Sequence, residues 1–151
     1  MRFLLACATI LLLAAQAQAS ELTVKVTKVE SAEGGVYVAL YGLEDGFPSR
    51  PCRWCQRVPA QPGTVAVLFP HLPPGRYAVS VYHDVNGNGR LDTNRFGVPT
   101  EPYGFSLDAR GSFGPPSFED ASFTVADQPL ALEINLVSNP PAPEPEPEPN
   151  F

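Results

Sequence analysis

The fold of this chain is decided by a turn and a strand that read Leu72-Pro73-Pro74-Gly75-Arg76-Tyr77, continued by Ala78-Val79-Ser80-Val81-Tyr82. The first six residues have the Leu-x-Pro-Gly-x-Tyr spacing of a tyrosine corner, in which the tyrosine hydroxyl donates to a backbone carbonyl a few residues upstream. Proline and glycine suit the tight turn, and a buried hydroxyl needs such an acceptor. The alternative is an ordinary loop that ends at a strand aromatic residue. We predict the corner.

Segments with the two-residue alternation of β-strands recur on both sides of this corner. They are bounded by turn residues and lie at 22–27, 36–41, 65–69, 77–82, 123–125 and 132–136. Between the two ends of the chain no segment has convincing helical periodicity. We therefore predict an all-β domain: an antiparallel β-sandwich, immunoglobulin-like or prealbumin-like, of about seven strands, with a long irregular segment from Thr93 to Ser117.

The strand after the corner leads into a run that reads His83-Asp84-Val85-Asn86-Gly87-Asn88-Gly89-Arg90-Leu91-Asp92. Oxygen-bearing side chains stand at every second position, and glycine follows the third of them. In a calcium loop the ligands come from positions one, three, five and nine and from the backbone carbonyl of position seven, with glycine at six. The spacing therefore predicts a calcium site whose ligands are Asp84, Asn86, Asn88, the carbonyl of Arg90, and Asp92.

The loop departs from the helical calcium hand, because position twelve is Arg95 instead of a bidentate glutamate. We expect the closing carboxylate from elsewhere, with Glu101 and Asp108 as the nearest candidates. With only two carboxylates in the loop, the dissociation constant should fall in the weak range of extracellular modules, ~10⁻⁴–10⁻³ M. The alternative is a pair of turns without metal, because the Asn-Gly dipeptides at 86–87 and 88–89 are strong turn formers.

The two ends of the chain differ from its middle. We predict a signal peptide over 1–19 from the positive charge of Arg2, an apolar run at 3–15 and the small residues of Ala17-Gln18-Ala19. The apolar run is too short to span a ~30 Å bilayer as a helix, which favours a removable signal peptide over an anchor. We therefore expect an exported protein, periplasmic or secreted, with no transmembrane segment after processing. The stretch 139–151 is rich in proline and alternates proline with glutamate over 143–149, which predicts a disordered, extended tail that acts as a spacer or aids solubility. The domain itself then spans 20–138.

The charge of the domain excludes some partners. The whole chain carries −6; setting aside the one positive charge of the leader and the three negative charges of the tail leaves −4. A mildly acidic domain without a basic stripe argues against binding to nucleic acid or to anionic membrane surfaces. The sequence makes no prediction of oligomeric state.

The exported protein keeps two cysteines, Cys52 and Cys55. In an oxidising compartment they predict a local disulfide. A thioredoxin-like redox pair lacks its βαβ context here, and a zinc site would have to add His71 and His83.

Four ordered blocks, at 75–79, 83–92, 97–106 and 115–120, resemble an uncharacterised family of small exported bacterial proteins that carries a domain-of-unknown-function label. The resemblance covers residues 22–137 and includes the His-Asp-x-Asn-x-Asn-Gly-x-Leu-Asp and Gly-Phe-Ser motifs. It implies a periplasmic location and a β-sandwich, and it brings no established activity. The tract from Phe47 to Pro62 and the proline-glutamate tail depart from the pattern. The loop is also similar to calcium loops in surface-protein β-sandwich repeats.

Two functions follow from these observations. The first is a non-catalytic, calcium-stabilised binding or structural module of the bacterial envelope, with an envelope protein or glycan as partner. The aromatic residues Tyr103, Phe105 and Phe113 would contact that partner or, alternatively, pack as a cover on the sandwich. The second is a periplasmic hydrolase that uses His83, Glu101 and Ser106. No nucleophile elbow supports it, because Gly104-Phe105-Ser106-Leu107-Asp108 lacks the second glycine.

Overall fold

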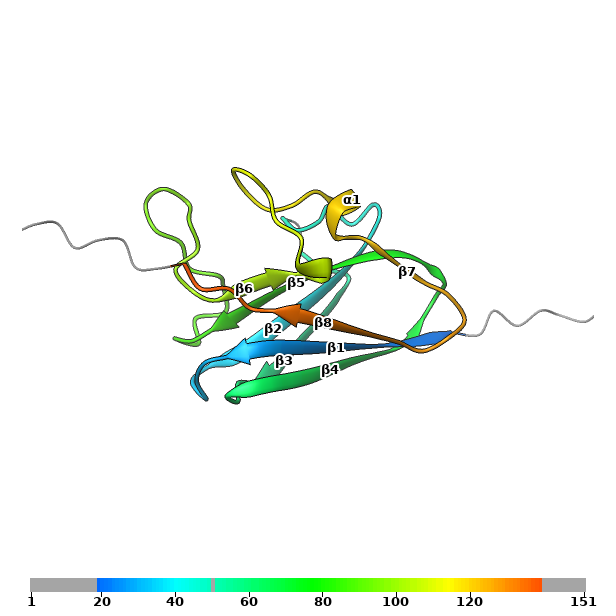
Figure 1. The fold of residues 1–151 in the computed structure, drawn as a ribbon, viewed down its shortest axis with the longest axis horizontal. Helices are drawn as coiled ribbons and strands as arrows, with labels where there is room; N and C mark the ends of the chain where they lie inside the picture. Colours follow the sequence, from blue (N-terminus) through cyan, green and yellow to red (C-terminus); the bar gives the residue numbers. More distant parts are fainter. Residues whose placement is uncertain (1–18, 50, 140–151) are drawn as a thin grey trace, which may run out of the picture.

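The computed structural model describes residues 19–49 and 51–139. The predicted signal peptide and tail therefore lie outside the described residues, apart from Ala19 and Asn139. The described chain is all-β, with eight strands in two sheets, as the sequence predicts (Figure 1). No helix in the described ranges is long and apolar enough to cross a membrane.

The first sheet has three strands in the order β4-β1-β8; their bounds are Gly63–Leu72, Ser20–Val29 and Leu130–Asn135. The second sheet has the order β3-β2-β5-β6, and β7 also pairs with β5; these strands are Trp54–Pro59 (β3), Gly35–Gly42 (β2), Gly75–Asp84 (β5), Tyr103–Phe105 (β6) and Phe123–Val125 (β7). A 3₁₀ turn (η1, Ser106–Asp108) and a one-turn helix (α1, Phe118–Ala121) lie between β6 and β7.

The two sheets pack face to face over one hydrophobic core. Alternation puts every second side chain of a strand inside, and in β1, β4, β5, β7 and β8 these are largely the residues that the sequence pattern selects. The most buried of them are Leu22, Val24, Val26, Val36, Val38, Leu40, Val67, Leu72, Val79, Val81 and Ile134. Each large apolar side chain buried in this way stabilises the fold by ~1.5–3 kcal/mol relative to exposure.

The tyrosine corner is confirmed. The hydroxyl of Tyr77 donates to the carbonyl of Pro73 at 2.8 Å, and the side chain is only 5% exposed. Burial raises the pKa of Tyr77, so the hydroxyl keeps its proton as a donor. The corner fixes where β5 begins and therefore where its far end, Asp84, leaves the sheet.

Replacing Tyr77 by phenylalanine should destabilise the domain by about 0.5–1.5 kcal/mol, because the hydrogen bond from the Tyr77 hydroxyl to the Pro73 carbonyl is lost. Urea unfolding followed by circular dichroism measures this change. The matched control is Tyr103→Phe, because the Tyr103 hydroxyl makes no hydrogen bond within the described ranges; it should change the free energy of unfolding by less than about 0.5 kcal/mol. Equal stability of Tyr77→Phe and wild type would contradict a stabilising corner.

Three features of the fold differ from the sequence prediction. The strand β3 lies in the tract from Phe47 to Pro62, where we predict none, and β6 lies in the segment that we predict to be irregular. The third difference is the pairing of β1 with β8, which is parallel and not antiparallel. Two parallel strands need a long connection between them. Here the connection from β1 to β8 contains the six other strands, β2 to β7.

Candidate metal centre

Asp84 anchors the predicted loop at the end of β5. Its side chain is fully buried, and its carboxylate accepts the backbone N–H groups of Asn88 at 3.0 Å and Gly89 at 2.8 Å. These bonds draw the chain into a tight turn around the carboxylate. Gly87 and Gly89 have φ values of +73° and +83°, which glycine adopts without strain. This turn brings the side chains of the alternating polar residues of 86–92 to one side of the loop.

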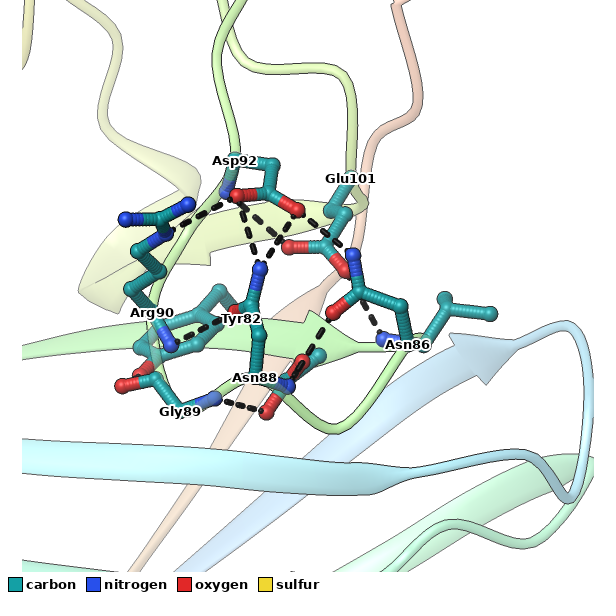
Figure 2. Close-up of polar contacts among 9 residues, drawn as sticks. Tyr82, Asn86, Asn88, Gly89, Arg90, Asp92 and Glu101 are labelled. Carbon is teal, nitrogen blue, oxygen red and sulfur yellow. Dashed lines mark hydrogen bonds and ion pairs between the residues drawn. The ribbon is translucent and has the colours of Figure 1, made fainter.

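The other predicted ligands converge on Asp92 (Figure 2). The Nδ2 atom of Asn86 donates to Asp92 at 2.6 Å, and that of Asn88 donates to both carboxylate oxygens at 2.8 and 2.9 Å. The Nε atom of Arg90 lies 3.3 Å from the same carboxylate. Asx turns hold the amide oxygens, because Asn86 accepts from the N–H of Asn88 and Asn88 from that of Arg90. Positions three, five and nine of the loop thus meet.

Glu101 joins the two ends of this loop from outside it. One of its oxygens accepts the N–H of Val85 at 2.9 Å and the other the N–H of Asp92 at 3.0 Å, and the residue is 6% exposed. Of the two carboxylates that we expect as closing ligands, Glu101 lies against the loop. Asp108 accepts instead from the backbone and side chain of Asn135 in β8.

The donor set fits a hard cation. Calcium takes six to eight oxygens from carboxylates, amides and backbone carbonyls, and Asp84, Asn86, Asn88, Arg90 and Asp92 offer these types. The amide nitrogens of the two asparagines now face Asp92. A half-turn of the terminal torsion, which is roughly two-fold, would present oxygen there in exchange for the Asx-turn hydrogen bonds. No group of three or more His, Cys, Asp and Glu side chains suited to a metal is found within 19–49 and 51–139. The site would therefore depend on asparagine and backbone oxygens.

Two ionisable groups, Asp92 in the loop and Tyr82 in β5 beside it, have shifted pKa values. Hydrogen bonds from Asn88 and Asn86 lower the pKa of Asp92. The resulting stabilisation is present above the unfolded pKa of aspartate and is lost as the pH falls through the lower folded value. Burial, with Tyr37 and Asp84 nearby, raises the pKa of Tyr82 to about 12, and its neutral hydroxyl donates to the Gly89 carbonyl at 3.2 Å. Near neutral pH Asp92 is therefore ionised and Tyr82 neutral, and these are the states in which they make the hydrogen bonds described.

The three residues of the hydrolase alternative are not brought together. His83 is fully buried, with Nε2 2.8 Å from the Glu33 carbonyl, and no partner for its Nδ1 is present among the described residues. Ser106 is buried as well; its Oγ donates to the Ala121 carbonyl at 2.5 Å and accepts the N–H of Val79 at 2.9 Å. In the described part of the chain no hydrogen bond links His83, Glu101 and Ser106 to one another.

The cysteines and the aromatic residues lie on the same side of the molecule. Cys52 and Cys55 form a disulfide, with Cα atoms 5.8 Å apart, at the start of β3. Tyr103, Phe105 and Phe113 line one large cavity together with this disulfide. Sequence reasoning did not find Tyr37 and Tyr82 as members of the same cavity, because both read as ordinary strand residues and only strand pairing places them side by side.

Comparison with known proteins gives a family and no function. Residues 24–133 match the model of a family described as "Uncharacterized protein conserved in bacteria (DUF2141)". Neither the curated proteins nor the solved structures contain a match.

Proposed function

We propose that this chain, which belongs to the DUF2141 family of uncharacterized proteins conserved in bacteria, is an exported, calcium-stabilised β-sandwich that serves as a non-catalytic binding or structural module of the bacterial envelope. One observation carries the proposal. Two buried carboxylates, Asp84 and Glu101, hold the loop backbone so that the side chains of Asn86, Asn88 and Asp92 converge. A turn that only reversed the chain would not require this convergence.

Calcium has a physical role in such a module. An ion that binds the folded state alone adds stability by mass action. A bound calcium ion would also take the place of the N–H groups that now donate to Asp92. It would then hold residues 84–92 in one conformation around the ion. The next residues, 93–99, line the large cavity, so ordering the loop supports one wall of that cavity. The calcium concentration in the envelope would then affect the shape of a binding surface.

Export is part of the same proposal. The signal-peptide pattern at 1–19 supports a location outside the cytoplasm, where free calcium reaches the concentrations that a weak site needs. The disulfide between Cys52 and Cys55 is compatible with an oxidising compartment.

The direct test is a calcium titration of the metal-stripped chain 20–151, followed by amide NMR. We expect shifts in residues 84–92, smaller shifts in 93–99 and a dissociation constant of ~10⁻⁴–10⁻³ M. Magnesium should bind more weakly, because it demands near-ideal octahedral geometry and gives up its waters reluctantly. Asp92→Asn should weaken binding but not abolish it, since position nine often acts through a water.

The matched control is Asp127→Ala, which removes an exposed carboxylate of the same type from a turn outside the loop. It should leave the calcium affinity unchanged. If the amides of 84–92 do not move at ~10 mM calcium, ten times the weakest expected constant, the loop is a pair of turns and the calcium part of the proposal is wrong.

A further inference from the structure

The large cavity beside the candidate metal centre is a groove that crosses the outer face of the β3-β2-β5-β6 sheet. Its volume is about 830 Å³, within the ~300–1,000 Å³ of typical ligand pockets. One wall is formed by residues of 91–99, the continuation of the calcium loop, and another by 112–115. In Figure 1 both loops extend from the β5–β6 side of the sandwich, away from β1 and β4. The groove is therefore open on the side opposite the core.

An aromatic row forms one part of the groove floor. Strand pairing aligns Arg57 with Tyr37, Tyr37 with Tyr82, and Tyr82 with Tyr103, so the row runs across four strands. The rings of Tyr37 and Tyr82 stack with centroids 4.9 Å apart and an angle of 4° between their planes. The Arg57 guanidinium lies 5.4 Å from the Tyr37 ring centroid, so the row ends in a positive charge at the β3 edge.

A second row, parallel to the first, is made of small side chains. It pairs Cys55 with Ala39 and Ala39 with Ser80, and it ends at Phe105, whose ring contacts that of Phe47. Small residues beside a row of tyrosines leave a channel that runs across the strands. Such a channel accepts an extended chain that lies against aromatic rings.

The walls of the groove expose large apolar side chains to solvent. Phe96 is 75% exposed and Phe113 fully exposed, and both line the groove. Exposed aromatic residues gathered around one concave surface mark a site of interaction.

We infer that this groove binds the proline-rich segment 140–149 of the same chain. Aromatic-lined grooves recognise proline-rich segments in the polyproline II conformation, because this conformation is already formed and loses little entropy on binding. Pro140 and Pro143 are one turn of that helix apart. The last described residue, Asn139, lines the groove, and its Nδ2 donates to the Pro99 carbonyl in the groove wall at 2.9 Å. The segment therefore starts at the rim.

The length of the segment matches the width of the groove. Val137 pairs with Tyr103 of β6, so the chain lies one strand beyond β6 and four strand spacings from β3. At ~4.8 Å per spacing, the distance to β3 is roughly 19 Å. Polyproline II advances ~3.1 Å per residue, so about six residues cross the groove. This places Glu144 and Glu146 on either side of the β3 edge, where Arg57 provides the opposite charge.

Attachment to the rim makes even a weak contact effective. A short connection raises the local concentration of the segment to the millimolar range. A free peptide with a dissociation constant of ~0.1 mM would then be bound about nine-tenths of the time when attached. This inference rests on the proposed binding role but not on calcium. It also replaces the expectation that the tail is only a spacer.

The test uses amide NMR of the chain 20–151 in metal-free buffer, so its result does not depend on calcium binding. Wild type is compared with a full-length variant in which Pro140, Pro141, Pro143, Pro145, Pro147 and Pro149 are serine. We expect shifts at groove residues such as Tyr37, Tyr82 and Tyr103, and none at Val24 or Val67 in the opposite sheet. A synthetic peptide of residues 140–149 added to the variant should return these signals toward wild type with a dissociation constant of ~0.1–1 mM, and wild type should bind it about tenfold more weakly, because its own segment competes.

A pair of matched substitutions locates the site. Ala39→Leu fills the channel and should abolish the difference between the wild-type and serine tails, whereas Ala131→Leu, on the exposed face of β8, should leave that difference intact. Identical groove signals for wild type and the serine variant would overturn the inference. So would peptide-induced shifts spread equally over both sheets, or groove signals that respond to a soluble glycan but not to the peptide.

Discussion

Replacing Gly34 by alanine is expected to remove about 3–5 kcal/mol of stability, a large part of the total for a domain of this size. A Cβ atom at this position would lie 1.8 Å from the backbone oxygen of Asp84 and 2.8 Å from that of Val85. These are backbone atoms, so no side chain can turn aside to make room. The φ of Gly34 is +66°, which adds the strain of a left-handed conformation. Urea unfolding of wild type and variant measures the loss.

The matched control is Gly97→Ala. Gly97 has a similar φ of +77°, but a Cβ atom added there would meet nothing within 4 Å, so this change isolates the conformational term of roughly 1 kcal/mol. If the two variants lose equal stability, the close approach of Gly34 to the backbone of Asp84 and Val85 does not contribute to the free energy of unfolding. The comparison matters for function, because Gly34 packs against the backbone on which the candidate metal centre is built.

The parts of the fold that the sequence predicts are those in which local pattern and tertiary environment agree. In β5 the large apolar residues Tyr77, Val79 and Val81 take alternate positions that face the core, and the corner is a local motif whose hydroxyl reaches back only four residues. The loop at 84–92 is equally local, since the backbone bonds of Asp84 reach four and five residues ahead. Spacing alone locates such features.

The parts that the sequence does not predict depend on distant partners. β3 places Gln56 at an inward position, where its amide donates to the Leu68 carbonyl of β4, so a polar residue interrupts the expected alternation. β6 has three residues, too few to show any period, and it exists through pairing with Ser80–Tyr82. The clamp formed by Glu101 needs two backbone groups seven residues apart that only the folded loop brings together. The groove likewise arises from strand register, which no single segment encodes.

The second large effect is expected at Asp84. Calcium should raise the thermal midpoint of the metal-stripped domain, and Asp84→Ala should abolish that increase. At a calcium concentration about one hundred times the dissociation constant, the ion adds about 2.7 kcal/mol. At roughly 4 °C per kcal/mol, this corresponds to a rise of ~10 °C. Differential scanning calorimetry with and without calcium measures it.

Asp84→Ala should also destabilise the metal-free protein, by about 1–3 kcal/mol for each backbone donor left without a partner. Gly89 loses the acceptor of its N–H, whereas the N–H of Asn88 keeps the Asn86 oxygen at 3.1 Å. Asp84→Asn separates the two effects, because it keeps the size of the side chain and removes the charge that a hard cation needs. It should therefore lose the calcium increment with a smaller drop in the metal-free midpoint. A calcium-induced rise that survives in both variants would show that the ion binds elsewhere, and an unchanged wild-type midpoint at several millimolar calcium would reduce the loop to a hydrogen-bonded turn held by Asp84 and Glu101.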